Sequence, residues 1–93
     1  MNNSLVFKKN PDFVMRVIED ETILIPIYKT SEEANYIYTL NKVGQKVWNL
    51  IDGKKTLGEI KKNILKKFDT TPEETEKELS RFLKDLKEIK AIV

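Results

Sequence analysis

The hydrophobic period of this chain changes once, near residue 41, and this change constrains the fold more than any other feature. Before it, apolar residues recur at every second position, which is typical of strands with one buried face. After it, they recur every three or four positions, as on amphipathic helices. The order predicts an α+β domain with a winged-helix-like arrangement, in which a three-stranded antiparallel sheet precedes a three-helix cluster (β-β-β-α-α-α).

Three segments have the pattern of strands. Residues 13–18 and 23–28 alternate, and the acidic residues between them predict a tight turn. Residues 35–41 are rich in aromatic and β-branched types and form the third expected strand. Phe13, Met15 and Val17 are expected on one face of the first strand. Pro26 has no N–H to donate, so it is expected at a strand end or bulge.

Three helices are expected after residue 41, each with a recognisable start. Asn41 is a candidate N-cap for the first helix, which Asp52-Gly53 would end. Thr56 and Glu59 have the spacing of a capping box, and residues 71–74 repeat it with a proline at the first helical position. The third helix is expected to run to about Lys90. The apolar residues expected on the buried faces are Val43, Val47, Trp48, Leu50 and Ile51, then Leu57, Ile60, Ile64, Leu65 and Phe68, then Leu79, Phe82, Leu83, Leu86 and Ile89.

Composition limits the chemistry. The chain of 93 residues is read as a single domain over 1–93, with 1–9 a candidate flexible end and the apolar tail 91–93 packed on the domain. It has neither cysteine nor histidine, and its glycines make no phosphate-binding loop, so we expect no enzymatic activity, no metal and no cofactor. No apolar run reaches the roughly 18 residues of a membrane helix. We expect a cytoplasmic protein.

The third strand is the most informative segment. Residues 35–41 carry no charge, although a third of the chain is charged. Tyr36, Tyr38 and Leu40 share one face, and Ile37 and Thr39 share the other. On the edge of the sheet such a strand would be a template for an extended peptide, because no lysine or proline blocks pairing. In the centre of the sheet the same pattern would be ordinary burial, and the residues alone leave both interpretations open.

The third helix offers a second wall for a peptide groove. Phe82 lies toward one border of its apolar stripe, and Glu78, Arg81 and Asp85 flank that border. These residues could receive apolar and charged side chains of a peptide, or could simply be core with a solvated flank. The candidate peptide-binding residues are Tyr36, Ile37, Tyr38, Thr39, Leu40, Glu78, Arg81, Phe82 and Asp85.

Two other functions fit the same elements. A winged-helix nucleic-acid-binding protein would insert its third helix into the major groove, but residues 73–78 carry four glutamates and one lysine, which phosphates would repel. Lys61, Lys62, Lys66 and Lys67 form a more basic surface without arginines or aromatics. A structural subunit that stabilises a partner enzyme through the apolar strand is the third alternative.

An ordered set of short motifs resembles the PqqD-like family, the pyrroloquinoline quinone biosynthesis protein D group and its relatives. The resemblance extends over residues 10–93. Its motifs are the pair Leu40-Asn41, a small residue three positions later (Gly44), the pair Val47-Trp48, Asp52-Gly53, the helix start 56–60, the opening segment 10–14 and the segment 71–74.

This resemblance implies a RiPP recognition element, a non-catalytic peptide chaperone that binds the leader of a ribosomally made precursor peptide. In that family the leader adds as a strand to the edge of the third strand and lies against the third helix, which favours the edge position here. Residues 36–40 would then pair with the leader, and Arg81, Phe82 and Asp85 would form the wall. The implied partners are the leader and a separate maturase such as a radical SAM enzyme, with neither nucleic acid nor membrane. We also expect that the same edge could join two copies in a homodimer.

Overall fold

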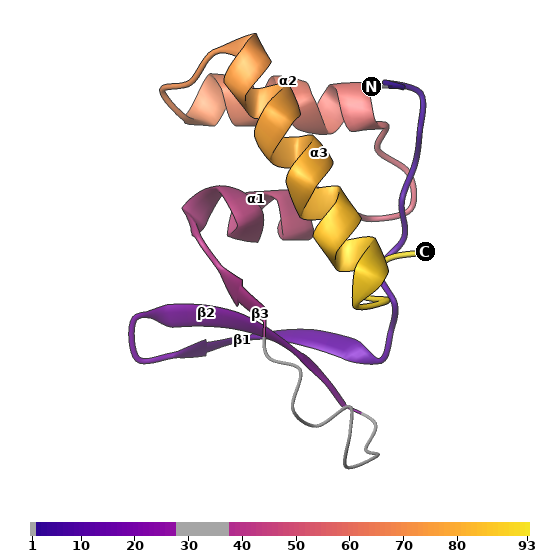
Figure 1. The fold of residues 1–93 in the computed structure, drawn as a ribbon, viewed down its shortest axis with the longest axis vertical. Coiled ribbons are helices and arrows are strands. Elements are labelled where there is room, and N and C mark those ends of the chain that lie inside the picture. Colours follow the sequence, from indigo (N-terminus) through magenta and orange to yellow (C-terminus); the bar gives the residue numbers. More distant parts are fainter. Residues whose placement is uncertain (1, 28–37) are drawn as a thin grey trace.

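The computed structural model describes residues 2–27 and 38–93, and their elements follow the expected order (Figure 1). The strands are β1 (Phe13–Ile18), β2 (Glu21–Pro26) and β3 (Tyr38–Leu40), and the helices are α1 (Lys42–Leu50), α2 (Leu57–Lys67) and α3 (Pro72–Glu88). The α+β class and the β-β-β-α-α-α order are therefore confirmed. The first part of the expected third strand, residues 35–37, lies outside the described residues.

The three strands form one antiparallel sheet in the order β1-β2-β3. A two-residue turn between Ile18 and Glu21 joins β1 to β2, as the acidic residues there predict. Leu24, in the middle of the sheet, lies between Met15 and Tyr38. Pro26 is the last residue of β2, where its missing N–H disrupts no ladder. Among the described strands β3 lies at an edge, which is the position that the resemblance favours.

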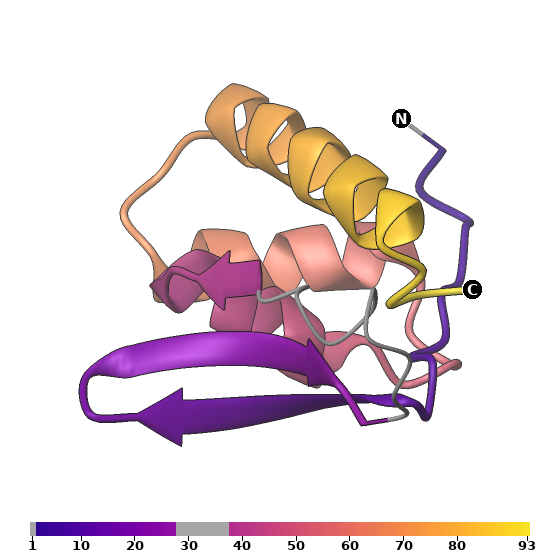
Figure 2. The same ribbon diagram turned by 60° about the horizontal axis from the view of Figure 1, so that its bottom comes forward.

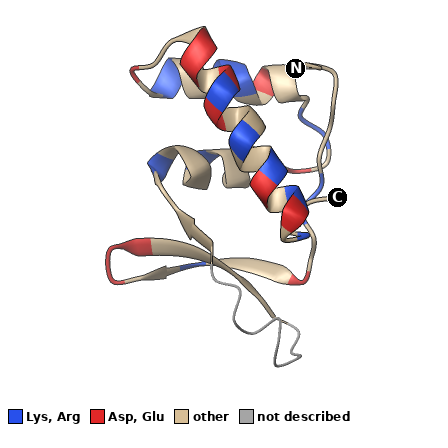
Figure 3. Cartoon of the chain, viewed as in Figure 1, with Lys and Arg blue, Asp and Glu red and all other residues tan. Residues whose placement is uncertain are grey.

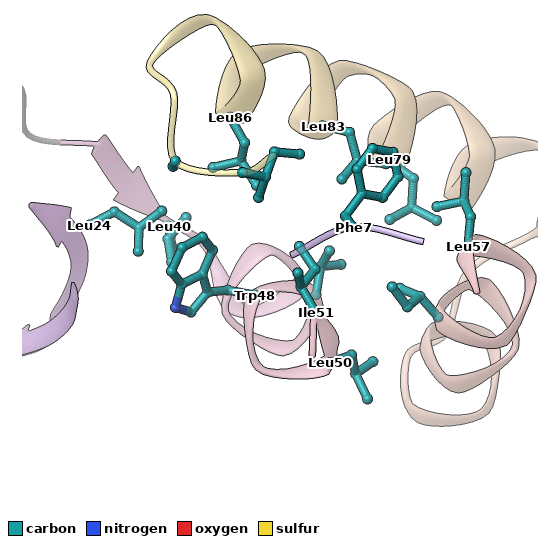
Figure 4. Close-up of a cluster of buried hydrophobic side chains, with 14 of the residues drawn as sticks. Phe7, Leu24, Leu40, Trp48, Leu50, Ile51, Leu57, Leu79, Leu83 and Leu86 are labelled. Carbon is teal, nitrogen blue, oxygen red and sulfur yellow. The ribbon is translucent and has the colours of Figure 1, made fainter. Parts of the chain in front are cut away.

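The helices cover one face of the sheet, and the core lies between these two layers (Figures 1 and 2). Figure 4 shows Leu24 and Leu40 from the sheet beside Trp48 of α1, with leucines of α3 above them. Leu24 and Leu86 are fully buried, and Trp48 is 4% exposed, so the tryptophan is a core residue. Apolar burial of this kind is the main favourable contribution to folding.

Two exposures differ from what the pattern suggests. Leu65 was expected to be buried, but it is only partly buried and lies outside the core. Val17 shares a face with Phe13 and Met15 as expected, but it is 63% exposed. It lies one pair from the hairpin turn on β1, the edge strand farther from β3, where the described elements leave it uncovered. The alternation was read correctly, but the length of strand that the helices cover depends on the tertiary arrangement.

The N-terminal and C-terminal segments pair with each other beside the loop that connects α1 and α2. The Gly53 N–H donates to the Phe7 carbonyl at 3.0 Å, and the Lys8 and Val93 backbones exchange bonds of 3.2 and 2.9 Å. The Phe7 side chain is 7% exposed, and Ala91 and Ile92 are buried beside it in the core. The C-terminal tail thus packs on the domain as expected, with the N-terminal segment between it and the loop.

The helix starts follow their sequence signals. The Asn41 side chain accepts a bond from the Gly44 N–H at 2.7 Å, and Thr56 and Glu59 form the full capping box. Thr71 caps α3 with Pro72 at the first helical position. The second box is only half formed, because the Glu74 carboxylate accepts from the Thr70 hydroxyl at 3.4 Å.

Two helix ends differ from expectation. The first helix ends at Leu50 with Ile51 as its C-cap, and Gly53, although left-handed at φ 79°, lies in the turn beyond. The third helix ends at Glu88, two residues earlier than expected. There the left-handed residue after the cap is Lys90, at φ 65°, and the Ala91 N–H donates back to the Leu86 carbonyl at 2.8 Å.

We expect Lys90→Gly to raise the free energy of unfolding by about 0.5 to 1 kcal/mol, because glycine adopts the left-handed conformation without the clash of a Cβ atom. Urea denaturation followed by circular dichroism measures the change. Lys84→Gly, at an exposed position inside α3, is the control and should lower stability by about 1 kcal/mol. A Lys90→Gly protein no more stable than the unmodified chain would contradict this account of the helix end.

Candidate functional site

A groove of about 300 Å³ lies where β3, α1 and α3 meet. The polar and apolar side chains that line it come from segments that are far apart in the sequence. It is lined by Tyr38, Thr39, Leu40, Asn41, Val43, Gly44, Val47, Glu78, Leu79, Arg81 and Phe82. A concave site with apolar walls and a few polar groups is the usual form of a binding site.

Six of the nine candidate peptide-binding residues line this groove together. Tyr38, Thr39 and Leu40 supply the strand side, and Glu78, Arg81 and Phe82 supply the helix side. Asp85 does not line the groove; its carboxylate is bonded to Tyr38. Tyr36 and Ile37 lie outside the described residues.

Phe82 and Gly44 form the contact between α3 and α1 in the floor of the groove. A Cβ atom on Gly44 would lie 3.4 Å from the Cε1 and Cζ atoms of the Phe82 ring, so the glycine lets α1 and the ring approach closely. The site predicted from sequence did not include Val43, Gly44 or Val47 of α1. The signal was present, since a small residue three positions after Asn41 is one of the motifs of the resemblance.

Tyr38 connects β3 to α3. Its hydroxyl donates to the Asp85 carboxylate at 2.9 Å, and its ring lies 6.0 Å from the Phe82 ring between centroids, tilted by 49°. Partial burial, followed by the bond to Asp85, raises the pKa of the Tyr38 hydroxyl to about 12. The strand and the helix are therefore held at a fixed separation at this end of the groove.

The direction of the backbone groups along the edge follows from the pairing. The Ile27 N–H donates to the Asp12 carbonyl at 2.7 Å, so the odd-numbered residues of β2 bond toward β1 and the even-numbered ones toward β3. Thr22 and Leu24 lie opposite Leu40 and Tyr38. Those two residues of β3 therefore bond to β2, and the N–H and carbonyl of Thr39 point to the open side of the sheet.

The basic surface of α2 gains no support as a nucleic-acid site. Lys61 forms an ion pair with Glu76 of α3 at 3.2 Å, which neutralises one of the four lysines. On α3, the helix that would enter the major groove, basic and acidic residues alternate along the visible face (Figure 3). A surface of mixed charge does not attract phosphates in the way that an uninterrupted basic stripe does.

Residues 2–27 and 38–93 contain neither a cluster of metal ligands nor a membrane-spanning helix. Within these ranges no three acidic side chains gather as metal ligands would. Of the helices there, none has the length and apolar character needed to cross a bilayer.

We expect Tyr38→Phe to lower the free energy of unfolding by about 1 kcal/mol at neutral pH, through loss of the bond to Asp85. Because the pKa of Tyr38 is raised in the folded state, its contribution is complete below about pH 10 and is lost as the pH rises toward 12. Urea melts of both proteins should therefore differ by a constant amount from pH 7 to pH 9 and converge above pH 10. A gap that does not close would contradict the assignment.

A protein-family model and a solved structure match this chain. The model of the family "Coenzyme PQQ synthesis protein D (PqqD)" matches residues 28–92. A solved structure, "TbiB1 in Complex with the TbiA(beta) Leader Peptide", is similar in fold with a TM-score of 0.72 and 24% sequence identity, over 91% of this chain and 93% of that one. A comparison with curated protein sequences gives no match.

Proposed function

This chain belongs to the coenzyme PQQ synthesis protein D (PqqD) family, and on that premise we propose that it binds the leader of a ribosomally made precursor peptide and presents it to a separate modifying enzyme. The chain itself would catalyse nothing. The observation that carries the proposal is the edge of β3, which no described strand covers, directly beside a groove of mixed polar and apolar lining. An extended peptide needs both features, backbone groups to pair with and a cavity for its side chains.

The edge supplies the backbone part of the interaction. Thr39 directs its N–H and carbonyl outward, so an incoming strand would bond there and continue the antiparallel sheet. Alternate side chains of that strand would point toward the face that carries Tyr38 and Leu40, and thus into the groove. Phe82 and the apolar residues of α1 then supply the surface that those side chains would bury.

The structural relative supports a leader peptide as the ligand. The TbiB1 structure is a complex with a leader peptide, and the fold that it shares with this chain extends over nearly the whole of both proteins. The proposed site on this chain consists of Tyr36, Ile37, Tyr38, Thr39 and Leu40 on the strand and Glu78, Arg81, Phe82 and Asp85 on the helix. Gly44 joins this set from the geometry of the groove floor.

We propose that the partner enzyme is a maturase of the radical SAM type, encoded as a separate protein. The chain would act as its substrate-binding module, in the cytoplasm where precursor peptides are made. A second copy of the chain could pair along the same β3 edge, and such a dimer would compete with the leader for Thr39. Adding leader should therefore dissociate any dimer that size-exclusion chromatography with light scattering detects.

Thr39→Pro tests strand addition directly. Proline removes the outward N–H and places its ring on the open edge, while no bond to β2 is lost. We expect the affinity for leader peptides encoded near this gene to fall at least about tenfold, measured by amide NMR titration. Thr39→Ala, which keeps the N–H, is the matched control and should bind within about twofold of the unmodified chain.

Other results of the titration would contradict strand addition at β3. Equal affinity of the Thr39→Pro and Thr39→Ala proteins would rule out pairing at this edge. Shifts confined to the lysines of α2 on addition of DNA would instead support the nucleic-acid alternative, and binding to a maturase without any peptide would support the structural-subunit alternative.

Gly44→Leu tests the groove independently of the edge. A leucine side chain at this position would extend over the Phe82 ring and occupy the floor of the groove. We expect leader affinity to fall about tenfold or more with little loss of helicity by circular dichroism. Gly44→Ala is the control, since its Cβ would meet Phe82 at an ordinary contact distance. Leader binding unaffected by leucine would show that the groove takes no part.

A further inference from the structure

The two charged side chains on the helix side of the groove carry opposite charges and lie one after the other along α3. Glu78 and Arg81 both line the groove and are exposed. Neither forms an ion pair with another residue among those that the structure describes. Asp85, the next charged residue on this border, accepts a bond from the Tyr38 hydroxyl instead.

The strand and the helix that form the groove run in opposite directions. Tyr38, at the start of β3, contacts Phe82 and is bonded to Asp85. Glu78 lies about one helical turn before Phe82, on the side away from Asp85. Following β3 toward α1 therefore means following α3 backwards, from Asp85 to Glu78 (Figure 1).

An added strand would meet the two charges in a fixed order. The existing sheet is antiparallel throughout, and parallel pairing is slightly less stable, so the added strand would run antiparallel to β3. It would then run in the same direction as α3 and pass Glu78 before Arg81. Residues two apart on a strand point to the same face and are separated by about 6.8 Å, whereas Glu78 and Arg81, three residues apart on α3, differ in height by about 4.5 Å. The long glutamate and arginine side chains can span this difference.

Resting on the proposed function, we propose that this groove selects peptides in which a basic residue precedes an acidic residue by two positions. The basic side chain pairs with Glu78 and the acidic side chain with Arg81. The reverse order places like charges together on both sites. Charge order thus adds specificity to a pairing that the peptide backbone alone would make with many sequences.

A selection from a randomised library of extended peptides displayed on phage, with the immobilised full chain as bait, tests the proposal. We expect peptides with the basic-x-acidic order to be enriched about fivefold over those with the acidic-x-basic order at low ionic strength. The ratio should fall toward one at high salt, because both pairs are exposed and screened.

A charge-swapped protein provides the decisive comparison. In the double variant Glu78→Lys and Arg81→Glu the net charge is unchanged, and the preferred order should reverse. The matched control is Lys84→Glu with Glu88→Lys, which swaps two exposed charges of α3 outside the groove and should leave the preference as it was.

The selection distinguishes failure of this inference from failure of the proposed function. Enriched peptides that no longer bind the Thr39→Pro protein but show no charge order would overturn the inference and leave strand addition in place. If none of the enriched peptides depends on Thr39, both the inference and the proposed function are wrong.

Discussion

The direct junction between β3 and α1 determines the geometry of the site. Leu40 is buried at the end of the strand, Asn41 caps the helix, and α1 begins at Lys42, so a single residue separates the two elements. The edge strand cannot shift along its neighbour without moving the first turn of α1. Because Gly44 in that turn packs on Phe82, the same junction also sets the distance from the edge to α3.

The small size of the domain explains why the chain ends matter. A domain of this length buries a modest core, and its stability depends on every segment that contributes to it. Phe7 fills space between the helices, and the backbone of its segment bonds to Gly53 on one side and to Val93 on the other. The family model matches only residues 28–92, so β1, β2 and this N-terminal segment lie outside the matched region although they complete the core.

The parts of the structure that sequence predicted are those governed by local interactions. At the helix starts the side chain of Asn41, Thr56 or Thr71 accepts a bond from the backbone N–H three residues later, and all three starts were predicted. The edge position of β3 could not be derived from the pattern, because an uncharged strand suits an edge and a centre equally. The resemblance favoured the edge, and the sheet order agrees with it.

The groove itself was only half predictable. The absence of charge on the third strand and the charged residues beside Phe82 on α3 indicated these two sides of the groove. The contribution of Val43, Gly44 and Val47 could not be predicted, because it depends on how α1 crosses α3. Asp85 lies on the expected border of α3. Its carboxylate is bonded to the Tyr38 hydroxyl, so it holds the tyrosine in place and does not line the groove. Phe7 was missed because the segment around it has no hydrophobic period.

The alternation of backbone groups along β3 has a consequence for how tightly an extended chain could be held there. Thr39 turns its N–H and carbonyl outward, whereas those of Tyr38 and Leu40 are used within the sheet. Each main-chain bond contributes only about 0.5 to 1.5 kcal/mol net. Pairing at Thr39 would therefore leave most of the residence time of a bound peptide to the side chains that it buries in the groove, because differences in affinity appear mainly in the dissociation rate.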